Sequence, residues 1–428
     1  MMNLAIIADD LTGANDSGVQ LAKYGLQTSV FFKMDKGNVQ SNEAIVFDTD
    51  SRAMAPAEAK KLVAKVTRFL LDEGINNIYK KIDSTMRGSI GAELAGMQQE
   101  LQADFIFIAP GYPSNNRKVI DGYHYLNGKL LGETEISLDP VTPVAESYLP
   151  ALLESQIGEE TGLISLAELR SSEKFIQKLN VLKEQGITYI IVDSEKEEDL
   201  QLFLSEVKKL SAAAGLVGSA GLANYLPAYF GLEAKEQTYQ IVNQNKPILT
   251  VVGSVNVNSR NQLNKLLADK SAYAIEIDSY KAVSSLGERK EEEQRVYNEV
   301  KKQVASGHDI VLYSSGERDD IDYARKIGES NGYNFTETSR EIVKMIGAVA
   351  AQLLKEGIFQ GIIMTGGDTA KKICEHWDIT GFTLYDELEA GVPISSFIGI
   401  ENLFAITKAG GFGQDNVLID ASKKLRGE

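Results

Sequence analysis

Short apolar runs recur through the first half of the chain, and each precedes a polar loop and a segment with helical periodicity. The runs are residues 4–8, 44–47, a segment ending at Tyr79, and 104–109. The helical segments run to about Tyr24, over 56–73 and over 90–101. Buried strands that alternate with helices are typical of a parallel sheet covered on both faces. The first half is therefore predicted to be an α/β domain.

The same alternation restarts at Pro247, after a polar stretch of weak periodicity that has the composition of a linker. Strands are predicted at 248–252, 272–277, 310–313 and 361–364, and helices to about Leu267, over 291–305 and over 342–356. We therefore predict two α/β domains with mostly parallel sheets, residues 1–230 and 247–428, joined by a linker at residues 231–246.

A hairpin is predicted within the first domain. Asn127-Gly128 separates two short segments, and this dipeptide strongly favours a tight two-residue turn. His124 is predicted to lie on the hairpin surface, although Arg117 and His124 could both border a ligand site. Further on, residues 187–192 are predicted as a strand and 195–213 as a helix.

Polar residues gather where three strands of the first domain end. In an open α/β sheet, ligands bind outside the carboxyl ends of the strands. Lysine and arginine suit a carboxylate or phosphate, and aspartate suits a hydroxyl or its proton. The pattern predicts a ligand site at this edge. Its residues are Asp10 after the first strand, Arg52 after the second, and Lys81, Asp83, Ser84 and Arg87 after the third.

The stretch from Tyr79 to Gly88 also has a purely structural interpretation. Ser84 or Thr85 would then cap the following helix, and the charges would be solvated. The Asp10 carboxylate could likewise cap the helix that follows it. Three polar loops in succession favour the functional interpretation over the structural one.

Three glycine-rich turns mark the second domain. Glycine lets the backbone approach phosphates, and a helix N-terminus attracts them. None of the turns matches the GxxxxGK[ST] or GxGxxG pattern, yet three within one domain favour nucleotide binding. The turns are Gly253-Ser254, Thr365-Gly366-Gly367-Asp368-Thr369 before a helix, and the stretch that begins Lys408-Ala409-Gly410-Gly411.

Composition and charge narrow the class of protein. With 43% hydrophobic and 24% charged residues, the 428-residue chain can bury sizeable cores. Its net charge of −16 argues against nucleic acid and anionic membranes as partners. With one cysteine and three histidines, the chain cannot form an internal disulfide, and it gives little support for a zinc site or a histidine triad.

The chain is expected to be cytoplasmic. No stretch approaches the ~20 apolar residues of a membrane helix, and the N-terminus lacks a signal-peptide pattern. Whether the protein forms a homo-oligomer is left open by the sequence.

Several motifs together resemble one family, the four-carbon acid sugar kinases, and they run the length of the chain. Residues 15–18 and 89–93 are more similar to the D-threonate and D-erythronate kinases than to the 3-oxo-tetronate kinases. The matching segments are residues 8–13 (ADDLTG), 50–52 (DSR), 80–88 (KKIDSTMRG), 253–254 (GS), 365–369 (TGGDT) and 408–413 (KAGGFG).

The resemblance implies an N-terminal sugar-acid domain and a C-terminal ATP domain of unusual kinase fold. The last loop departs from the family pattern, because Ala409 stands where serine is expected. The implied substrate-binding residues are Asp10, Arg52, Lys81, Ile82, Asp83 and Ser84, with Arg87 beside them. The implied ATP-binding residues are Ser254, Gly366, Gly367, Asp368, Thr369, Lys408, Ala409, Gly410 and Gly411.

The resemblance further implies phosphorylation of the terminal 4-hydroxyl of D-threonate or D-erythronate, with ATP and Mg²⁺. Arg52 or Lys81 would hold the carboxylate. Asp83 or Asp10 would be the catalytic base, and Asp83 is placed first because Lys81 could keep it ionised. The alternatives are a 3-oxo-tetronate 4-kinase, another ATP-dependent enzyme such as a ligase, and a non-catalytic sugar-acid sensor. The glycine-rich turns argue against the sensor.

Overall fold

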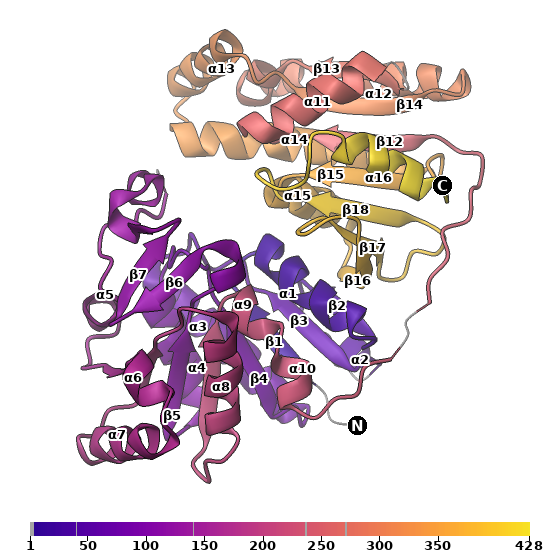
Figure 1. Ribbon diagram of the computed structural model, residues 1–428. Coiled ribbons are helices and arrows are strands. Elements are labelled where there is room, and N and C mark those ends of the chain that lie inside the picture. The colour runs from indigo at the N-terminus through magenta and orange to yellow at the C-terminus, as the bar shows by residue number, and fades with distance from the viewer. Residues whose placement is uncertain (1–3, 40, 140, 236–237, 270–271) are drawn as a thin grey trace. The chain divides into compact units, whose positions relative to one another are not determined.

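The apolar runs become buried strands in each of the two units into which the chain divides, residues 1–237 and 238–428. The computed structural model describes residues 4–39, 41–139, 141–235, 238–269 and 272–428. Within each unit, helices cover the strands on two sides (Figure 1). The predicted α/β class with mostly parallel strands is confirmed.

Parallel strands organise the first unit. They lie in the order β2-β3-β1-β4-β11-β5-β10-β9, and every neighbouring pair is parallel. Every residue of β1, β2, β3 and β5 is buried, as expected where helices cover both faces. The strands are β1 Leu4–Ala8, β2 Thr28–Phe31, β3 Ala44–Asp48, β4 Asn77–Lys81, β5 Phe105–Ala109, β9 Gly162–Ile164, β10 Tyr189–Val192 and β11 Ala214–Gly218.

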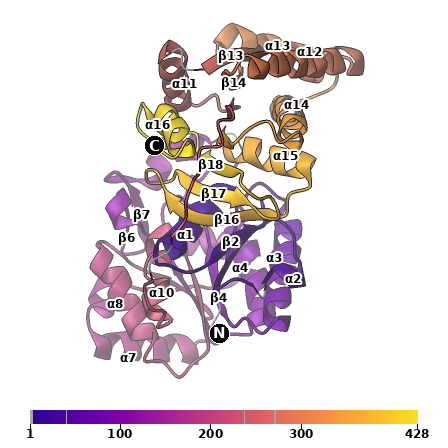
Figure 2. The same ribbon diagram turned by 90° about the vertical axis from the view of Figure 1, so that its right-hand side faces the viewer.

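Two helical layers cover these strands. Helix α4 packs on α3 and α5, whereas α9 packs on α1 and α8. Figure 2 shows α3 and α4 on the opposite side of β4 from α8 and α10. The helices are α1 Leu11–Lys23, α2 Lys36–Val39, α3 Pro56–Asp72, α4 Ile90–Leu101, α5 Leu149–Ile157, α6 Leu166–Leu169, α7 Ser172–Glu184, α8 Glu197–Val207, α9 Ala220–Ala223 and α10 Leu226–Tyr229.

A small antiparallel sheet lies outside the parallel order. Its strands are β6 Arg117–Ile120, β7 Tyr123–Leu126 and β8 Lys129–Leu130. The predicted hairpin is confirmed, since Asn127 and Gly128 adopt the positive φ angles, 52° and 81°, that its turn requires. The predicted surface position of His124 is wrong, because this side chain is completely buried.

The strands of the second unit lie in the order β13-β14-β12-β15-β18-β17-β16. Neighbours from β13 to β18 are parallel, while β17 runs antiparallel to both β18 and β16. The apolar pattern of the sequence does not predict the last three strands of the chain. The strands are β12 Ile248–Val252, β13 Ala272–Ile277, β14 Asp309–Ser314, β15 Gly361–Thr365, β16 Gly381–Glu387, β17 Pro393–Phe397 and β18 Phe404–Lys408.

Helices again form two layers in the second unit. Helix α11 packs on α16, and α14 packs on α12, α13 and α15. Figure 2 shows β18 between α16 and α15. No helix within the described ranges combines the length and apolar content needed to cross a bilayer. The helices are α11 Val257–Asp269, α12 Leu286–Ala305, α13 Arg318–Ser330, α14 Phe335–Lys355, α15 Gly367–Trp377 and α16 Val417–Leu425.

Several predicted boundaries are wrong. Strand β4 continues through Lys80 and Lys81 instead of ending at Tyr79, because both lysines pair with β1. Helices α12 and α14 each begin several residues before their predicted starts. Ser285 and Asn334 cap them, and each has a glutamate three residues later that completes a capping box. That spacing is present in the sequence and marks both starts.

Limited proteolysis is expected to cut first within residues 231–247. The described residues of this stretch form no helix or strand, and most are exposed. Lys235 donates its backbone N–H to Tyr24 in the first unit, and Tyr239 packs against the core of the second. Mass spectrometry should therefore find two fragments that match the two units. A first cut within residues 80–88 would contradict a well-packed loop after β4.

Candidate active site

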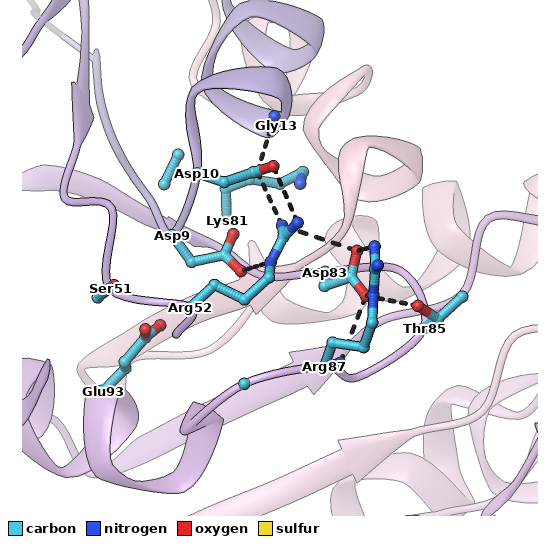
Figure 3. Close-up of polar contacts among 12 residues, drawn as sticks. Asp9, Asp10, Gly13, Ser51, Arg52, Lys81, Asp83, Thr85, Arg87 and Glu93 are labelled. Carbon is cyan, nitrogen blue, oxygen red and sulfur yellow. Dashed lines mark hydrogen bonds and ion pairs between the residues drawn. The ribbon is translucent and has the colours of Figure 1, made fainter. Parts of the chain in front are cut away.

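Three strand ends meet at one edge of the first unit. Strand β1 lies between β3 and β4, and Ala8 is in register with Asp48 on one side and with Lys81 on the other. The loops after these strands therefore begin side by side. Figure 3 shows the result, with Asp10, Arg52 and Asp83 facing one another from three loops.

Arg52 is the centre of this group. Its Nε donates to Asp9 at 2.7 Å, and its two terminal nitrogens donate to the two oxygens of Asp10 at 2.8 and 2.7 Å. Asp83 lies 3.7 Å from the same guanidinium. Burial opposes the charge on Asp9, but Arg52, Lys80 and Lys81 together lower the pKa of this carboxyl below its ordinary value. One partly buried arginine thus holds three carboxylates in place.

Asp83 is held by a second arginine. Arg87 donates to it through Nε at 2.7 Å and through a terminal nitrogen at 3.1 Å, and the Thr85 hydroxyl donates to it as well. Burial alone would raise the pKa of Asp83, yet Arg52, Arg87 and Thr85 hold the pKa far below its ordinary value. The carboxylate is therefore ionised, and the two arginines rather than Lys81 are the cause.

The rest of this loop is mostly structural. Ile82 is buried, and its N–H donates to the carbonyl of Gly218 at 2.9 Å, so it presents neither a side chain nor an N–H to a ligand. Ser84 is partly exposed. The interpretation of Ser84 or Thr85 as a helix cap is wrong, because α4 begins after Ser89.

Lys81 is buried, and its ammonium lies against Gly13 at the start of α1; the residue is 4% exposed. A Cβ on Gly13 would lie 2.5 Å from Lys81 Nζ and 2.7 Å from Asp10 Oδ1, so only glycine leaves room for both groups. Asp10 also caps α1 by accepting from the Gly13 N–H at 2.9 Å. Within the described residues the Lys81 ammonium has no hydrogen bond or ion pair, which leaves it available to an anionic oxygen.

A buried ion pair that the sequence analysis missed lies next to these residues. Lys80 Nζ is 2.8 Å from Glu93, and both side chains are essentially inaccessible to solvent. Burial raises the pKa of Glu93 above its ordinary value and outweighs the attraction of Lys80. Lys80 also donates to the carbonyl of Lys81 at 2.9 Å, so the pair fixes the end of β4 where Lys81 stands.

The second unit contains a cavity of about 530 Å³ at the ends of β12, β14 and β15. Five of the predicted ATP-binding residues line it, namely Ser254, Gly366, Gly367, Asp368 and Thr369. Apolar residues line another part of the wall, among them Ile321, Ala324, Phe335, Ile342 and Val343. A polar backbone turn next to an apolar wall suits a nucleotide, whose phosphates and base differ in the same way.

Gly366 makes the turn from β15 into α15. Its φ of 93° is open to glycine but strained for residues with a Cβ. The turn places the first residues of α15 on the cavity wall, and their N–H groups have no acceptor within the helix. The Gly366 N–H donates to the Lys408 carbonyl at 2.8 Å and so ties this turn to the loop after β18.

The loop after β18 is built around Lys408. Its ammonium donates to the carbonyls of Ala409, Gly410 and Phe412 at 2.9 to 3.1 Å. Burial lowers the pKa of Lys408 to about 8. Lys408 thus stabilises its own loop. The sequence did not predict that its ammonium donates to backbone carbonyls of the same loop.

Helix α11 also stabilises the loop after β18. Asn258 and Gln262 donate side-chain amides to the carbonyls of residues 411–414. With these carbonyls turned inward, the backbone N–H groups of Gly410 and Gly411 have no acceptor among the described residues. A Cβ on Gly410 would lie 2.7 Å from the Ser254 hydroxyl, so the loop lies directly against the cavity wall. The arrangement suits an anion.

Within the described ranges, no group of three or more His, Cys, Asp or Glu side chains could hold a metal ion. Mg²⁺ in nucleotide sites is held largely by phosphates and water, with one or two carboxylates. Asp368, in the first turn of α15, is a carboxylate on the cavity wall and fits that requirement.

Comparison with known proteins identifies the family. Residues 4–226 match the sugar-binding N-terminal domain and residues 249–418 the nucleotide-binding C-terminal domain. The D-threonate kinase of Salmonella typhimurium strain LT2 is 30% identical over 98% of this chain and 97% of its own. The D-erythronate kinase of Heliobacterium modesticaldum is 28% identical over 93% and 90%. The chain belongs to the four-carbon acid sugar kinase family.

Other relatives extend the comparison. A 3-oxo-tetronate kinase of Actinobacillus succinogenes is 25% identical over 97% of this chain and 98% of its own. The crystal structure of a Haemophilus influenzae protein has a TM-score of 0.77 and 25% identity, and it covers 99% of this chain and 100% of that one. A Salmonella typhimurium LT2 structure, with a TM-score of 0.83 and 24% identity over 99% and 100%, supports the fold alone.

Glu93→Gln should destabilise the first unit by about 3–5 kcal/mol, because it leaves the Lys80 ammonium buried without its counter-ion. The double variant Lys80→Met/Glu93→Leu should recover much of this loss, since no buried charge remains. Chemical denaturation measures both. Lys183→Gln, which removes an exposed ion pair with Asp104, is the control and should change the unfolding free energy little. Equal stability of Glu93→Gln and the control would contradict a buried charge pair.

Gly366→Ala should weaken Mg-ATP binding at least about 10-fold, because a Cβ at this φ strains the turn that presents the α15 N–H groups. Calorimetry measures the affinity. Gly307→Ala is the matched control, since Gly307 has a similar φ of 83° and a Cβ added there would meet no described atom within 4 Å. An unchanged Mg-ATP affinity in folded Gly366→Ala would exclude this turn as the phosphate cradle.

Proposed function

We propose that this protein transfers a phosphoryl group from ATP to the terminal 4-hydroxyl of a four-carbon sugar acid, D-threonate or D-erythronate. Residues 1–230 would bind the sugar acid and residues 247–428 the nucleotide, with residues 231–246 as the linker. The names of the relatives support this substrate class. The two matched domains support the division of labour.

The observation that carries the proposal is the Lys81 ammonium, unpaired within the described residues, beside Asp10 and Arg52. A buried cation that makes no direct hydrogen bond or ion pair is costly in a folded chain, and an anionic ligand removes that cost. Arg52 is less suited to this role, because its Nε and both terminal nitrogens already donate to Asp9 and Asp10. Lys81 is therefore our preferred cation for an anionic oxygen, either of the sugar carboxylate or of the phosphoryl group.

Asp10 is the preferred acceptor of the hydroxyl proton. Its side chain is 23% exposed, compared with 10% for Asp83. The pKa of Asp83 is held so low by Arg52 and Arg87 that its carboxylate accepts a proton weakly. Asp83 would then position the two arginines. This reverses the order of the two candidates that the sequence favoured.

The nucleotide would lie in the cavity of the second unit. Backbone N–H groups of α15 and of Gly410 and Gly411 would hold its phosphates, and the apolar wall around Phe335 would contact the base. Mg²⁺ bound to the phosphates would neutralise charge during transfer. Ala409 contributes its carbonyl to Lys408, so the serine expected there is not needed to build the loop.

We further infer a cytoplasmic enzyme with small-molecule partners. The net charge of −16 disfavours nucleic acid and anionic membranes. The oligomeric state is left open, as it is by the sequence.

A coupled assay of ADP release over four-carbon and neighbouring sugar acids tests the proposal. D-Threonate or D-erythronate should give one ADP per phosphorylated acid with a free carboxylate. Preference for a 3-oxo-tetronate would favour that alternative, and an acyl product would indicate a ligase. A protein stabilised by the sugar acid but not by Mg-ATP in thermal-shift experiments would be a sensor, and the proposal would fall.

Asp10→Asn should lower kcat by about 10²-fold or more with little change in the KM for the sugar acid, because it removes the proton acceptor and keeps the shape. Asp83→Asn should mainly raise KM and lower the melting temperature, because Arg52 and Arg87 lose a shared anion. Steady-state kinetics on both variants decides. The opposite pattern would make Asp83 the base, and normal turnover in both would mean that neither is.

A further inference from the structure

The small sheet β6-β7-β8 turns one face into the first unit. Arg117 pairs with Leu126 and Val119 pairs with His124, so these four side chains share a face. Val119, His124 and Leu126 are at most 4% exposed, which identifies this face as the inner one. Lys118 points to the opposite face of the same strand.

Polar atoms on the inner face have no partners among the described residues. Both ring nitrogens of His124 and the Nε of Arg117 are buried there without a hydrogen bond. The Ser194 hydroxyl is also buried without a hydrogen bond, and the backbone of Ser194 pairs with Val119. The Arg117 side chain does donate through a terminal nitrogen to the carbonyl of Asn115. Burying such groups unsatisfied is costly, and apolar residues would pack this face at lower cost.

These groups lie close to the candidate active site. The Asp83 carboxylate is the strongest charge acting on both His124 and Arg117, and Arg87 also acts on Arg117. Burial lowers the pKa of His124 to about 4, so the ring is neutral near pH 7 and offers one donor and one acceptor. Arg117 adds a guanidinium whose fork is largely unused, next to an Asp83 already bound by Arg87.

The chemistry of the two side chains is that of a hydroxy acid. A free guanidinium fork binds a carboxylate in a bidentate manner, and a neutral imidazole binds a hydroxyl as donor or acceptor. In a sugar acid the carboxylate and a hydroxyl occupy neighbouring carbons. D-Threonate and D-erythronate differ in configuration at that hydroxyl-bearing carbon.

We propose that Arg117 binds the carboxylate of the sugar acid and that His124 binds the adjacent hydroxyl and discriminates its configuration. This inference rests on the proposed function and deepens it. The acid end of the substrate then lies at the β6-β7 sheet, and the reacting 4-hydroxyl lies at Asp10. Lys81 is left for the reacting end rather than for the carboxylate.

Kinetics with Arg117→Met and Lys118→Met tests the carboxylate site. The two residues are adjacent cations on opposite faces of β6, so Lys118→Met is a matched control. Arg117→Met should raise the KM for the sugar acid at least 50-fold with kcat within threefold, while the control stays within twofold of wild type. Mg-ATP affinity should be unchanged in both. If Arg117→Met folds and its KM stays within twofold of wild type, the carboxylate assignment is overturned.

Arg117→Lys keeps the positive charge but lacks the forked guanidinium. This variant tests the carboxylate assignment if Arg117→Met does not fold. Its KM should rise about 10-fold, since a lysine cannot make the bidentate contact. An unchanged KM in this variant overturns the assignment as well. Added guanidinium ion should partly restore the activity of Arg117→Ala, which a merely structural loss would not show.

His124→Phe tests the hydroxyl contact, because it keeps a ring in the core and removes both nitrogens. The ratio of kcat/KM for the two epimeric acids should shift at least 10-fold toward unity, and an unchanged ratio overturns the role of His124. Wild-type protein that phosphorylates no sugar acid would refute the proposed function and this inference together. If the wild-type protein phosphorylates a sugar acid and the Arg117 and His124 variants have unchanged kinetics, this inference alone would be refuted.

Discussion

The first unit depends on one electrostatic constraint, the need to neutralise three carboxylates that its topology brings together. Asp9, Asp10 and Asp83 leave β1 and β4 at the same edge, and like charges at such separations repel strongly in a medium of low polarity. Arg52, from the loop after β3, meets all three. The edge is therefore assembled by folding itself, and the proposed sugar acid would meet groups that are already in position.

In the second unit, cationic and amide donors neutralise backbone carbonyls rather than carboxylates. The carbonyls of its glycine-rich loop point toward Lys408 and α11, which leaves the N–H groups of Gly410 and Gly411 without an acceptor among the described residues. Lys408 and the amides of Asn258 and Gln262 supply donors for those carbonyls. A lysine in a glycine-rich loop is usually taken as a phosphate ligand. Here it stabilises the backbone that would bind the phosphate, and the backbone N–H groups rather than the lysine would contact the ligand.

The sequence predicts those features that are encoded locally. Uniformly apolar runs such as β1 and β5 and the turn at Asn127-Gly128 follow from neighbouring residues alone. The loops that carry Asp10, Arg52 and Asp83 follow from the alternation of strands and helices along the chain. Partners distant in the chain do not follow, because periodicity says nothing of which charges meet. The sequence therefore could not show that Arg52 is occupied by Asp9, 43 residues away, or that His124 is buried.

These facts together suggest how a chain of net charge −16 would bind the two anions proposed for it. The overall field repels them, and most cations near the strand ends are cancelled by carboxylates within hydrogen-bond distance. Attraction must then come from cations left uncancelled in places of low polarity, where a short contact is strong and salt screens it little. Lys81 is such a cation. Arg117 is a second one under the proposal that it binds the carboxylate of the sugar acid. Recognition on this view comes from a few desolvated contacts rather than from long-range steering, which suits a small substrate distinguished by one carbon centre.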